Sequence, residues 1–114
     1  MSDCLFCAIA SGGIPAEFVY EDDAVVAFRD LNPQAPVHVL VIPRAHHATA
    51  AAVAADAPEL TARLVGAAAV VAEREGVADS GYRIVTNTGD AAGQSVHHVH
   101  LHVLGGRDLA WPPG

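Results

Sequence analysis

Histidine alternates with apolar residues near the C-terminal end of the chain. The segment Ser95–Leu104 has histidine at positions 98, 100 and 102 and valine or leucine at positions 99, 101 and 103. A period of two predicts a β-strand with imidazoles on one face and core residues on the other. Alternate side chains on a strand are about 6.5 Å apart. Neutral imidazole is a base and a metal ligand near neutral pH, so the row predicts a functional site. His97 has the opposite parity, and we expect it at the core edge or at an interface.

The composition indicates a small folded protein. The 114 residues suit one domain over positions 1–114, and hydrophobic and charged contents of 52% and 17% are typical of a folded chain. The net charge of -7 argues against binding a nucleic acid polymer. We find no bilayer-spanning segment, and Met1–Cys4 lacks the features of a signal peptide. We therefore expect a cytoplasmic protein with no membrane partner.

Apolar runs between turn residues predict an α+β fold with an antiparallel sheet. We expect a short helix at Leu5–Ala10 and a main helix from about Ala57 to Glu75, with Asp56 as its N-cap, Glu59 at N3 and Gly76 after its end. Such a sheet leaves edges to be covered, which makes dimerisation plausible. The five expected strands are 18–20, 24–28, 37–42, 82–87 and 95–104.

Two cysteines, Cys4 and Cys7, are separated by two residues. In a cytosolic protein such a pair consists more often of metal ligands or free thiols than of a disulfide. The C-x-x-C spacing is common in structural zinc sites, but four ligands are needed. The spacing alone therefore leaves both zinc ligands and free thiols open.

The triad and the residues before it resemble a known family. Residues 87–107 read N-x-G-x-x-x-G-Q-S-V-x-H-x-H-x-H-V-L-G-G-R. This pattern resembles the signature of the histidine triad (HIT) family, His-φ-His-φ-His-φ-φ, in which φ is apolar. Residues 21–23, 28–30, 33–36 and 40–46 also match, and Trp111–Gly114 is similar to the end of the Hint branch. The resemblance extends from about Cys4 to Gly114.

The resemblance implies a five-stranded α+β domain whose sheet joins that of a second subunit in a homodimer. It also implies a purine nucleotide site that hydrolyses nucleoside 5′-phosphoramidates, of the adenosine type, to a nucleoside monophosphate and an amine. The family nucleophile corresponds to His100. This fits the chemistry, because a covalent nucleotidyl-imidazole splits a difficult displacement into two easier steps.

Further site residues follow from the resemblance. We expect His98 to complete the triad and a protonated His102 to stabilise the phosphoryl oxygens. Five further residues have a functional role implied by the resemblance and also a structural alternative. Asn87 and Asp30 could merely cap turns, and Ser95 could be no more than the first residue of a strand. Phe6 and Leu31 could be ordinary core residues. The implied roles are phosphate or leaving-group contact for Ser95, phosphate contact for Asn87, backbone N–H donation by Gly93 and Gln94, ribose binding by Asp30, base binding by Phe6 and Leu31, and substrate contact by Trp111.

The resemblance also implies a structural zinc site formed by Cys4, Cys7, His46 and His98, with His47 as an alternative to His46. A site with four protein ligands leaves no position for water. Zinc is not required for the chemistry in this hypothesis. The chain departs from the family pattern by combining the cysteine pair with the Hint-like tail, and His97 occupies a position that is commonly aromatic.

Three other functions remain open. A dinucleoside polyphosphate hydrolase of the Fhit branch is less favoured because Gly105–Arg107 and Trp111–Gly114 match the Hint branch. A non-catalytic nucleotide-binding regulator would not need Ser95 and His100. A metal carrier would use the His-x-His-x-His segment, but it would not explain the upstream Asn87.

Overall fold

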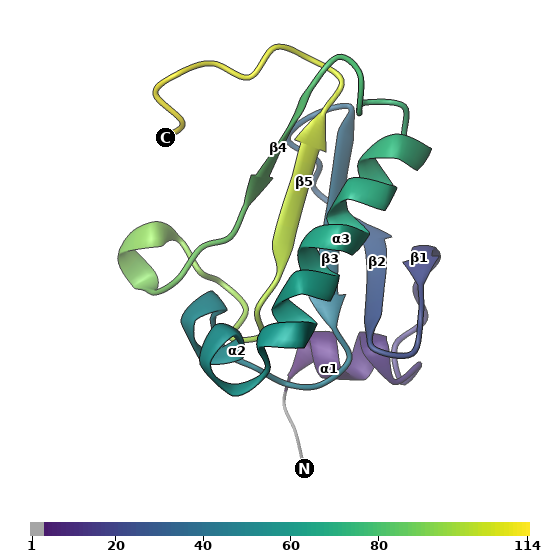
Figure 1. Ribbon diagram of the computed structural model, residues 1–114, viewed down its shortest axis with the longest axis vertical. Helices are drawn as coiled ribbons and strands as arrows, with labels where there is room; N and C mark the ends of the chain where they lie inside the picture. Colours follow the sequence, from purple (N-terminus) through teal and green to yellow (C-terminus); the bar gives the residue numbers. More distant parts are fainter. Residues whose placement is uncertain (1–3) are drawn as a thin grey trace.

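The computed structural model describes residues 4–114 (Figure 1). Met1–Asp3, considered above for a signal peptide, lie outside the described residues. None of the helices within residues 4–114 combines the length and hydropathy that crossing a membrane requires. The elements are, in order, α1 (Leu5–Ala10), β1 (Phe18–Glu21), β2 (Val25–Arg29), β3 (Val37–Pro43), α2 (Ala50–Asp56), α3 (Pro58–Arg74), β4 (Tyr82–Val85), a 3-10 turn η1 (Asp90–Ala92) and β5 (Leu101–Gly105).

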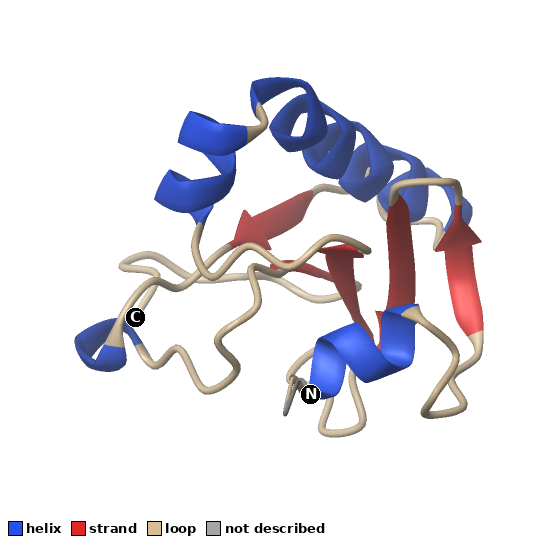
Figure 2. Cartoon of the chain, turned by 90° about the horizontal axis from the view of Figure 1, so that it is seen from below, coloured by secondary structure: helices blue, strands red, loops and turns tan. Residues whose placement is uncertain are grey.

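The five strands form one antiparallel sheet in the order β1-β2-β3-β5-β4. Helix α3 covers one face of this sheet, and α1 lies on the opposite face (Figure 2). The structure thus confirms the expected α+β fold with a short N-terminal helix and one long helix. Strand β5 lies between β3 and β4, so the residues that lead into it run close to the centre of the sheet.

The two faces of the sheet carry separate cores. Between the sheet and α3, Leu64 and Val71 pack with Val99, Leu101 and Val103. The core on the other face, under α1, contains seven residues, which are Phe6, Ile9, Ala10, Val26, Phe28, Leu40 and Ile42. The apolar members of the alternating segment therefore enter the α3 core, as their period predicts.

Two expected strand boundaries and the expected cap of the long helix were wrong. Strand β4 ends at Val85 rather than at position 87. Strand β5 begins at Leu101 rather than at position 95, and the residues before it bend at Val96–His98. The long helix begins at Pro58, and its N-cap Ala57 makes no side-chain bond. Asp56 instead ends α2, a helix that the sequence analysis did not predict and that Thr49 caps by accepting the Ala52 N–H at 3.1 Å. Gly76 follows the long helix with φ +78°, as expected of a helix stop.

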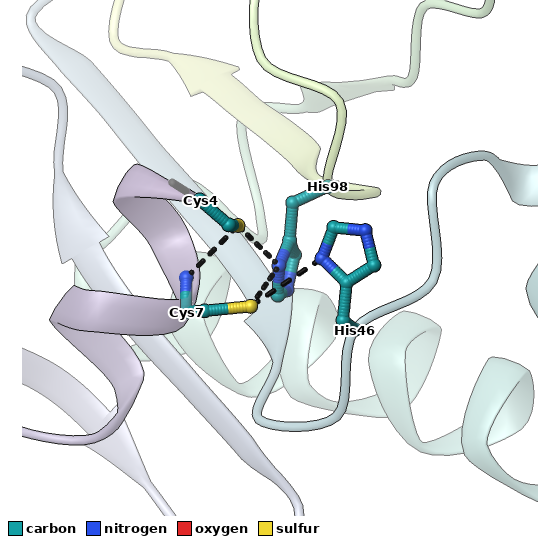
Figure 3. Close-up of side chains that lie close together, drawn as sticks. All are labelled: Cys4, Cys7, His46 and His98. Carbon is teal, nitrogen blue, oxygen red and sulfur yellow. Dashed lines mark hydrogen bonds between the residues drawn. The ribbon is translucent and has the colours of Figure 1, made fainter. Parts of the chain in front are cut away.

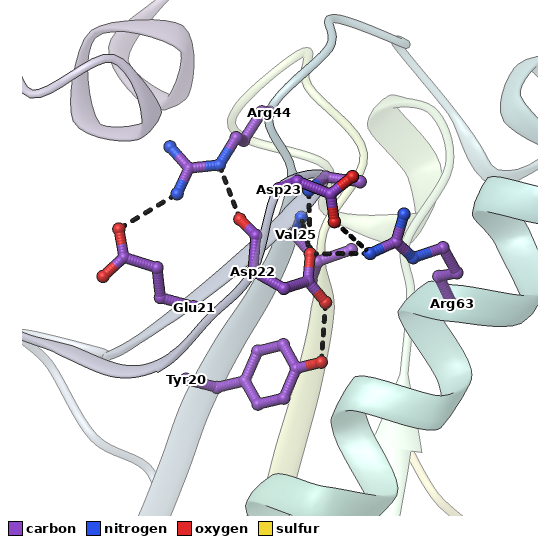
Figure 4. Close-up of polar contacts among 8 residues, drawn as sticks. Tyr20, Glu21, Asp22, Asp23, Val25, Arg44 and Arg63 are labelled. Atoms are coloured by element: carbon purple, nitrogen blue, oxygen red, sulfur yellow. Dashed lines mark hydrogen bonds and ion pairs between the residues drawn. The ribbon is translucent and has the colours of Figure 1, made fainter.

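Arginine side chains connect α1, the β1–β2 turn and α3 (Figure 4). Arg44, directly after β3, donates to the carbonyls of Ala10 and Asp22 at 2.9 Å each. Arg63 of α3 contacts the carboxylates of Asp22 at 3.1 Å and Asp23 at 2.6 Å. The Arg44 bond to the last residue of α1 holds that helix, and with it the two cysteines, beside the end of β3.

Candidate active site and metal cluster

The environment of His100 fixes which of its nitrogens is reactive. The ring is buried, and Nδ1 lies 2.8 Å from the backbone oxygen of His98. A carbonyl only accepts, so Nδ1 carries the proton and Nε2 keeps its lone pair. Phe6 packs edge-on against the ring, with centroids 5.0 Å apart and an interplanar angle of 89°. The geometry thus leaves Nε2 as the nitrogen of His100 that can act as a nucleophile.

His98 points toward the two cysteines (Figure 3). The ring is fully buried, and Nε2 donates to the Pro43 carbonyl at 2.8 Å. The lone pair on Nδ1 therefore faces Sγ of Cys4 at 3.2 Å and Sγ of Cys7 at 3.4 Å. His46 joins from the loop after β3, with its Nδ1 3.3 Å from Sγ of Cys7. The first triad histidine thus belongs to a Cys2His2 cluster and not to the row that faces a substrate.

The geometry of this cluster fits a tetrahedral metal ion. The four donor atoms lie within 4.8 Å of one another, and thiolate and imidazole are the ligands that zinc prefers. The tautomer of His98 leaves the required nitrogen unprotonated, and the Cys7 N–H already donates to Sγ of Cys4 at 3.1 Å. His47 contributes only its carbonyl, which accepts from Val99 at 2.6 Å. The structure therefore brings His46, rather than His47, to the cluster.

A residue that the sequence analysis missed, His38, orients the last triad histidine. The Gln34 N–H donates to Nδ1 of His38 at 3.0 Å, so Nε2 of His38 carries the proton and lies 2.9 Å from Nδ1 of His102. In the β3–β5 register Leu40 pairs with His102, so His38 is its diagonal neighbour on the same face. A histidine in the apolar β3 run, next to the triad strand, was the available signal.

This chain of hydrogen bonds fixes His102 as a neutral donor. Its Nδ1 accepts from His38, so its Nε2 carries a proton. Burial, followed by repulsion from His100 and His38, lowers the pKa of His102 to about 4, although Asp30 acts in the opposite direction. The expectation of a protonated His102 was therefore wrong at neutral pH, because the buried position disfavours the charged ring.

Asp30 also lies beside His38. Asp30, His38 and His102 form a second group of possible ligands, but they do not suit a metal ion. One Asp30 oxygen lies 3.5 Å from Nε2 of His38, and the other accepts the Asn32 N–H at 2.8 Å. A cation on Nε2 would require the His38 proton to move to Nδ1, where it would face the Gln34 N–H. The hydrogen bonding therefore favours a proton, rather than a metal ion, between Nε2 of His38 and Nδ1 of His102. Asp30 both caps a turn and lies near His38.

An apolar cavity of about 360 Å³ adjoins this region, between α1 and the end of β2. Leu31 lines it and is otherwise fully exposed, which excludes an ordinary core role. Phe6 is not among the lining residues; it is buried against Phe28 and His100. The role of Phe6 in binding a base therefore stays a prediction. The lining consists of Leu5, Ile9, Ile14, Pro15, Ala16, Glu17, Phe28, Arg29 and Leu31.

Hydrogen bonds within the chain hold the loop before the triad. The N–H groups of Gly93 and Gln94 donate within the turn, to the carbonyls of Asp90 at 3.0 Å and Gly89 at 3.1 Å. The buried Gln94 side chain accepts from Gly89 at 2.9 Å and donates to the Ala48 carbonyl at 2.8 Å. These hydrogen bonds fix the shape of the loop, and the expected donation of the Gly93 and Gln94 N–H groups to a phosphate stays a prediction.

The remaining predicted residues lie around this loop or beyond the sheet. Ser95 is exposed and Asn87 is partly buried, on the connection between β4 and β5. His97 is exposed in the single chain, which excludes the core-edge alternative, whereas the interface alternative stays a prediction. Trp111 is 82% exposed and comes after the C-terminal end of β5, whereas His98 precedes the first residue of that strand. The expected contact of Trp111 with a substrate stays a prediction.

Comparison with known proteins identifies the family. The HIT domain matches residues 11–109. The chain belongs to the HIT family of hydrolases. A HIT family hydrolase from Legionella pneumophila Philadelphia 1 has a similar crystal structure, with a TM-score of 0.94, 51% identity, and coverage of 98% of this chain and 100% of that one.

Two relatives bear more specific names. The purine nucleoside phosphoramidase of Escherichia coli (strain K12) is 45% identical over 107 residues, which are 94% of this HIT protein and 90% of the relative. The 14 kDa zinc-binding protein of Brassica juncea is 46% identical over 114 residues, with coverage of 98% and 100%. These names describe the relatives, and they guide the proposals below.

Proposed function

We propose that this HIT protein hydrolyses purine nucleoside 5′-phosphoramidates through a covalent nucleotidyl-histidine. The observation that carries the proposal is the hydrogen bond from Nδ1 of His100 to the His98 carbonyl, which leaves Nε2 as the nucleophile. The similarity to a purine nucleoside phosphoramidase supports the choice of substrate.

The reaction has two displacements. Nε2 of His100 bonds to phosphorus while the P–N bond breaks. The departing amine takes up a proton, which we propose comes from solvent through the exposed Ser95 hydroxyl. The ring becomes positively charged, and the His98 carbonyl stabilises it by accepting from Nδ1. Water then attacks phosphorus and loses one proton to solvent, the bond to Nε2 breaks, and His100 returns to its starting form. The neutral His102 donates Nε2–H to a phosphoryl oxygen in both steps.

We assign the substrate contacts from the same surroundings. The apolar cavity lined by Leu31 and Phe28 suits the flat face of a purine. The Asp30 carboxylate suits the ribose hydroxyls, because ionised carboxylates only accept hydrogen bonds. Asn87 is assigned to the phosphate, and Trp111 remains a predicted substrate contact.

The test is release of AMP from adenosine 5′-phosphoramidate by the intact protein and by His100→Ala. We expect turnover to vanish in the variant and a nucleotidyl adduct to be detectable by mass spectrometry in the intact protein under rapid quench. His97→Ala is the matched control, because this exposed neighbour should retain turnover. A diadenosine polyphosphate run in parallel separates the two hydrolase hypotheses. Full turnover by His100→Ala would refute the proposed nucleophile.

We also propose that Cys4, Cys7, His46 and His98 bind a structural zinc ion. The four converging donor atoms and the tautomer of His98 support this assignment. The zinc content of the purified protein should be one per chain and should be lost in Cys4→Ala/Cys7→Ala, together with a lower melting temperature. Unchanged metal content in the double variant would contradict the site.

We propose further that the protein is a homodimer. Strand β4 is one edge of the sheet, and next to it lies an apolar cavity of about 200 Å³ whose lining includes Val65 and Ile84. These two side chains are 50% and 38% exposed, which is unusual for large apolar residues beside an open edge. Sedimentation should give twice the chain mass, and Ile84→Glu should shift it toward the monomer. A monomeric intact protein at micromolar concentration would refute the assignment.

A further inference from the structure

His98 connects the metal cluster to the nucleophile through two parts of one residue. Its ring nitrogen Nδ1 faces the sulfur atoms of Cys4 and Cys7 at 3.2 and 3.4 Å. Its backbone oxygen accepts from Nδ1 of His100 at 2.8 Å. Any rotation of the His98 backbone would therefore move the ring out of the cluster and the carbonyl away from His100 at the same time.

The loop that carries His46 holds the same segment from the other side. The Pro43 carbonyl accepts from the His98 ring at 2.8 Å, and the His47 carbonyl accepts the Val99 N–H at 2.6 Å. His46 lies between these two acceptors in the sequence and contacts Cys7 at 3.3 Å. The loop therefore contacts the segment just before the nucleophile at the ring of one residue and at the backbone of the next.

The segment that carries His98 lies outside the paired part of the sheet, so its position depends on these contacts. Strand β5 begins at Leu101, so His98 lies before the first ladder pair. The sheet thus aligns His102 directly, whereas the carbonyl that orients His100 depends on the side chains and loop around it. Cys4, Cys7, His46 and His98 would hold a metal ion together, and this shared coordination would limit the relative motion of α1, the loop after β3 and this segment.

We propose that Cys4, Cys7 and His46 are positioning residues for the nucleophile. With these residues held by a metal ion, His98 would be fixed, and its carbonyl would keep the proton of His100 on Nδ1 and the lone pair on Nε2. Loss of the ion would free the carbonyl to rotate and the His100 ring to sample both tautomers and other orientations. The consequence for catalysis rests on the proposed role of His100, whereas the effect on its ring does not.

The test compares the ring nitrogens of His100 by ¹⁵N nuclear magnetic resonance in three states of the full chain: zinc-loaded, stripped by a chelator, and reloaded with zinc. We expect a single Nδ1–H tautomer in the loaded protein, exchange between tautomers after stripping, and recovery on reloading. In parallel, kcat for adenosine 5′-phosphoramidate should fall about tenfold or more on stripping, with KM changed less than about twofold.

Variants separate positioning from general loss of structure. His46→Asn should give the stripped signature, whereas His46→Cys, which keeps a metal ligand, should restore both the His100 signal and kcat. His97→Asn is the matched control, since this exposed histidine is next to His98 but outside the cluster. If His46→Asn fails to fold, the chelator and reloading series decides the question on unmodified protein.

Two results would overturn the proposal. One is a His100 ring whose nitrogen signals are unchanged by metal removal, and the other is a kcat that is insensitive to metal while zinc leaves the protein. An absence of turnover in the intact, loaded protein would refute the proposed hydrolysis instead. In that case the nitrogen signals would still report whether the cluster orients His100, so the two failures are distinguishable.

Discussion

Substitution of His38 tests whether a relay of hydrogen bonds sets the tautomer of His102. In His38→Leu, Nδ1 of His102 loses its donor at 2.9 Å, and the Gln34 N–H loses its acceptor at 3.0 Å. His102 is then free to move its proton to Nδ1, which would present a lone pair instead of an N–H to the phosphoryl oxygen. We therefore expect His38→Leu to reduce kcat even though His38 is not assigned any contact with phosphorus.

The magnitude follows from the bonds lost. A buried group that loses its partner costs about 1–3 kcal/mol, and a neutral hydrogen bond contributes about 0.5–1.5 kcal/mol. Loss of one neutral donor to the transition state therefore lowers kcat by roughly tenfold, since about 1.4 kcal/mol corresponds to a factor of ten. The unpaired Gln34 N–H and His102 nitrogen should lower the free energy of unfolding of His38→Leu by about 2 kcal/mol.

Two polar variants of His38 separate its hydrogen bond to His102 from its hydrogen bond to Gln34. His38→Gln places an amide N–H near the position of Nε2 and should retain the bond to His102, so kcat should stay within a few-fold of the intact protein. His38→Asn reaches only the position of Nδ1 and should behave like His38→Leu in kcat. Steady-state release of AMP and urea unfolding measure the two effects. Equal losses of kcat in the Gln and Leu variants, or none in the Leu variant, would refute the reasoning.

Two further predictions concern stability. The pKa of His102 is lowered to about 4 in the folded protein, so the unfolded state binds a proton first, and stability should be constant above about pH 6.5 and decrease toward pH 4, by about 2 kcal/mol after allowance for partial exposure. As the pH is lowered from about 6.5 toward 4, the urea midpoint should fall less in His102→Gln than in the intact protein. An identical decrease in both would contradict the assignment of this pH dependence to His102. Leu64→Ala should cost about 2–5 kcal/mol by thermal unfolding because Leu64 is 1% exposed, whereas Glu73→Ala, at an exposed position of the same helix, should cost well under 1 kcal/mol; similar losses would contradict the core.

Local pattern predicted much of the fold because it depends on neighbouring residues. The alternation in Ser95–Leu104 correctly separated the α3 core from the histidine face, and Leu5–Ala10 forms the expected helix. Helix α2 was missed because its alanine-rich sequence has little amphipathic pattern, and its cap at Thr49 was overlooked. The start of β5 was misplaced, because strand length is set by the partners β3 and β4 and not by the segment itself.

The candidate site divides in the same way. The residues themselves indicated a triad, a nucleophile at His100 through the family resemblance, and a cysteine pair suited to zinc. The sequence by itself thus determined the chemical groups and the face on which the histidines lie, since both follow from residue type and a local period of two.

Only the tertiary structure decided what each histidine does. The protons of His98 and His100 are set by the carbonyls of Pro43 and His98, and that of His102 by His38 from a strand far away in the sequence. The choice of His46 over His47 and the neutral state of His102 depend likewise on contacts with distant segments. Tautomer, charge and ligand geometry arise from a group's surroundings in space, and a one-dimensional pattern does not contain those surroundings.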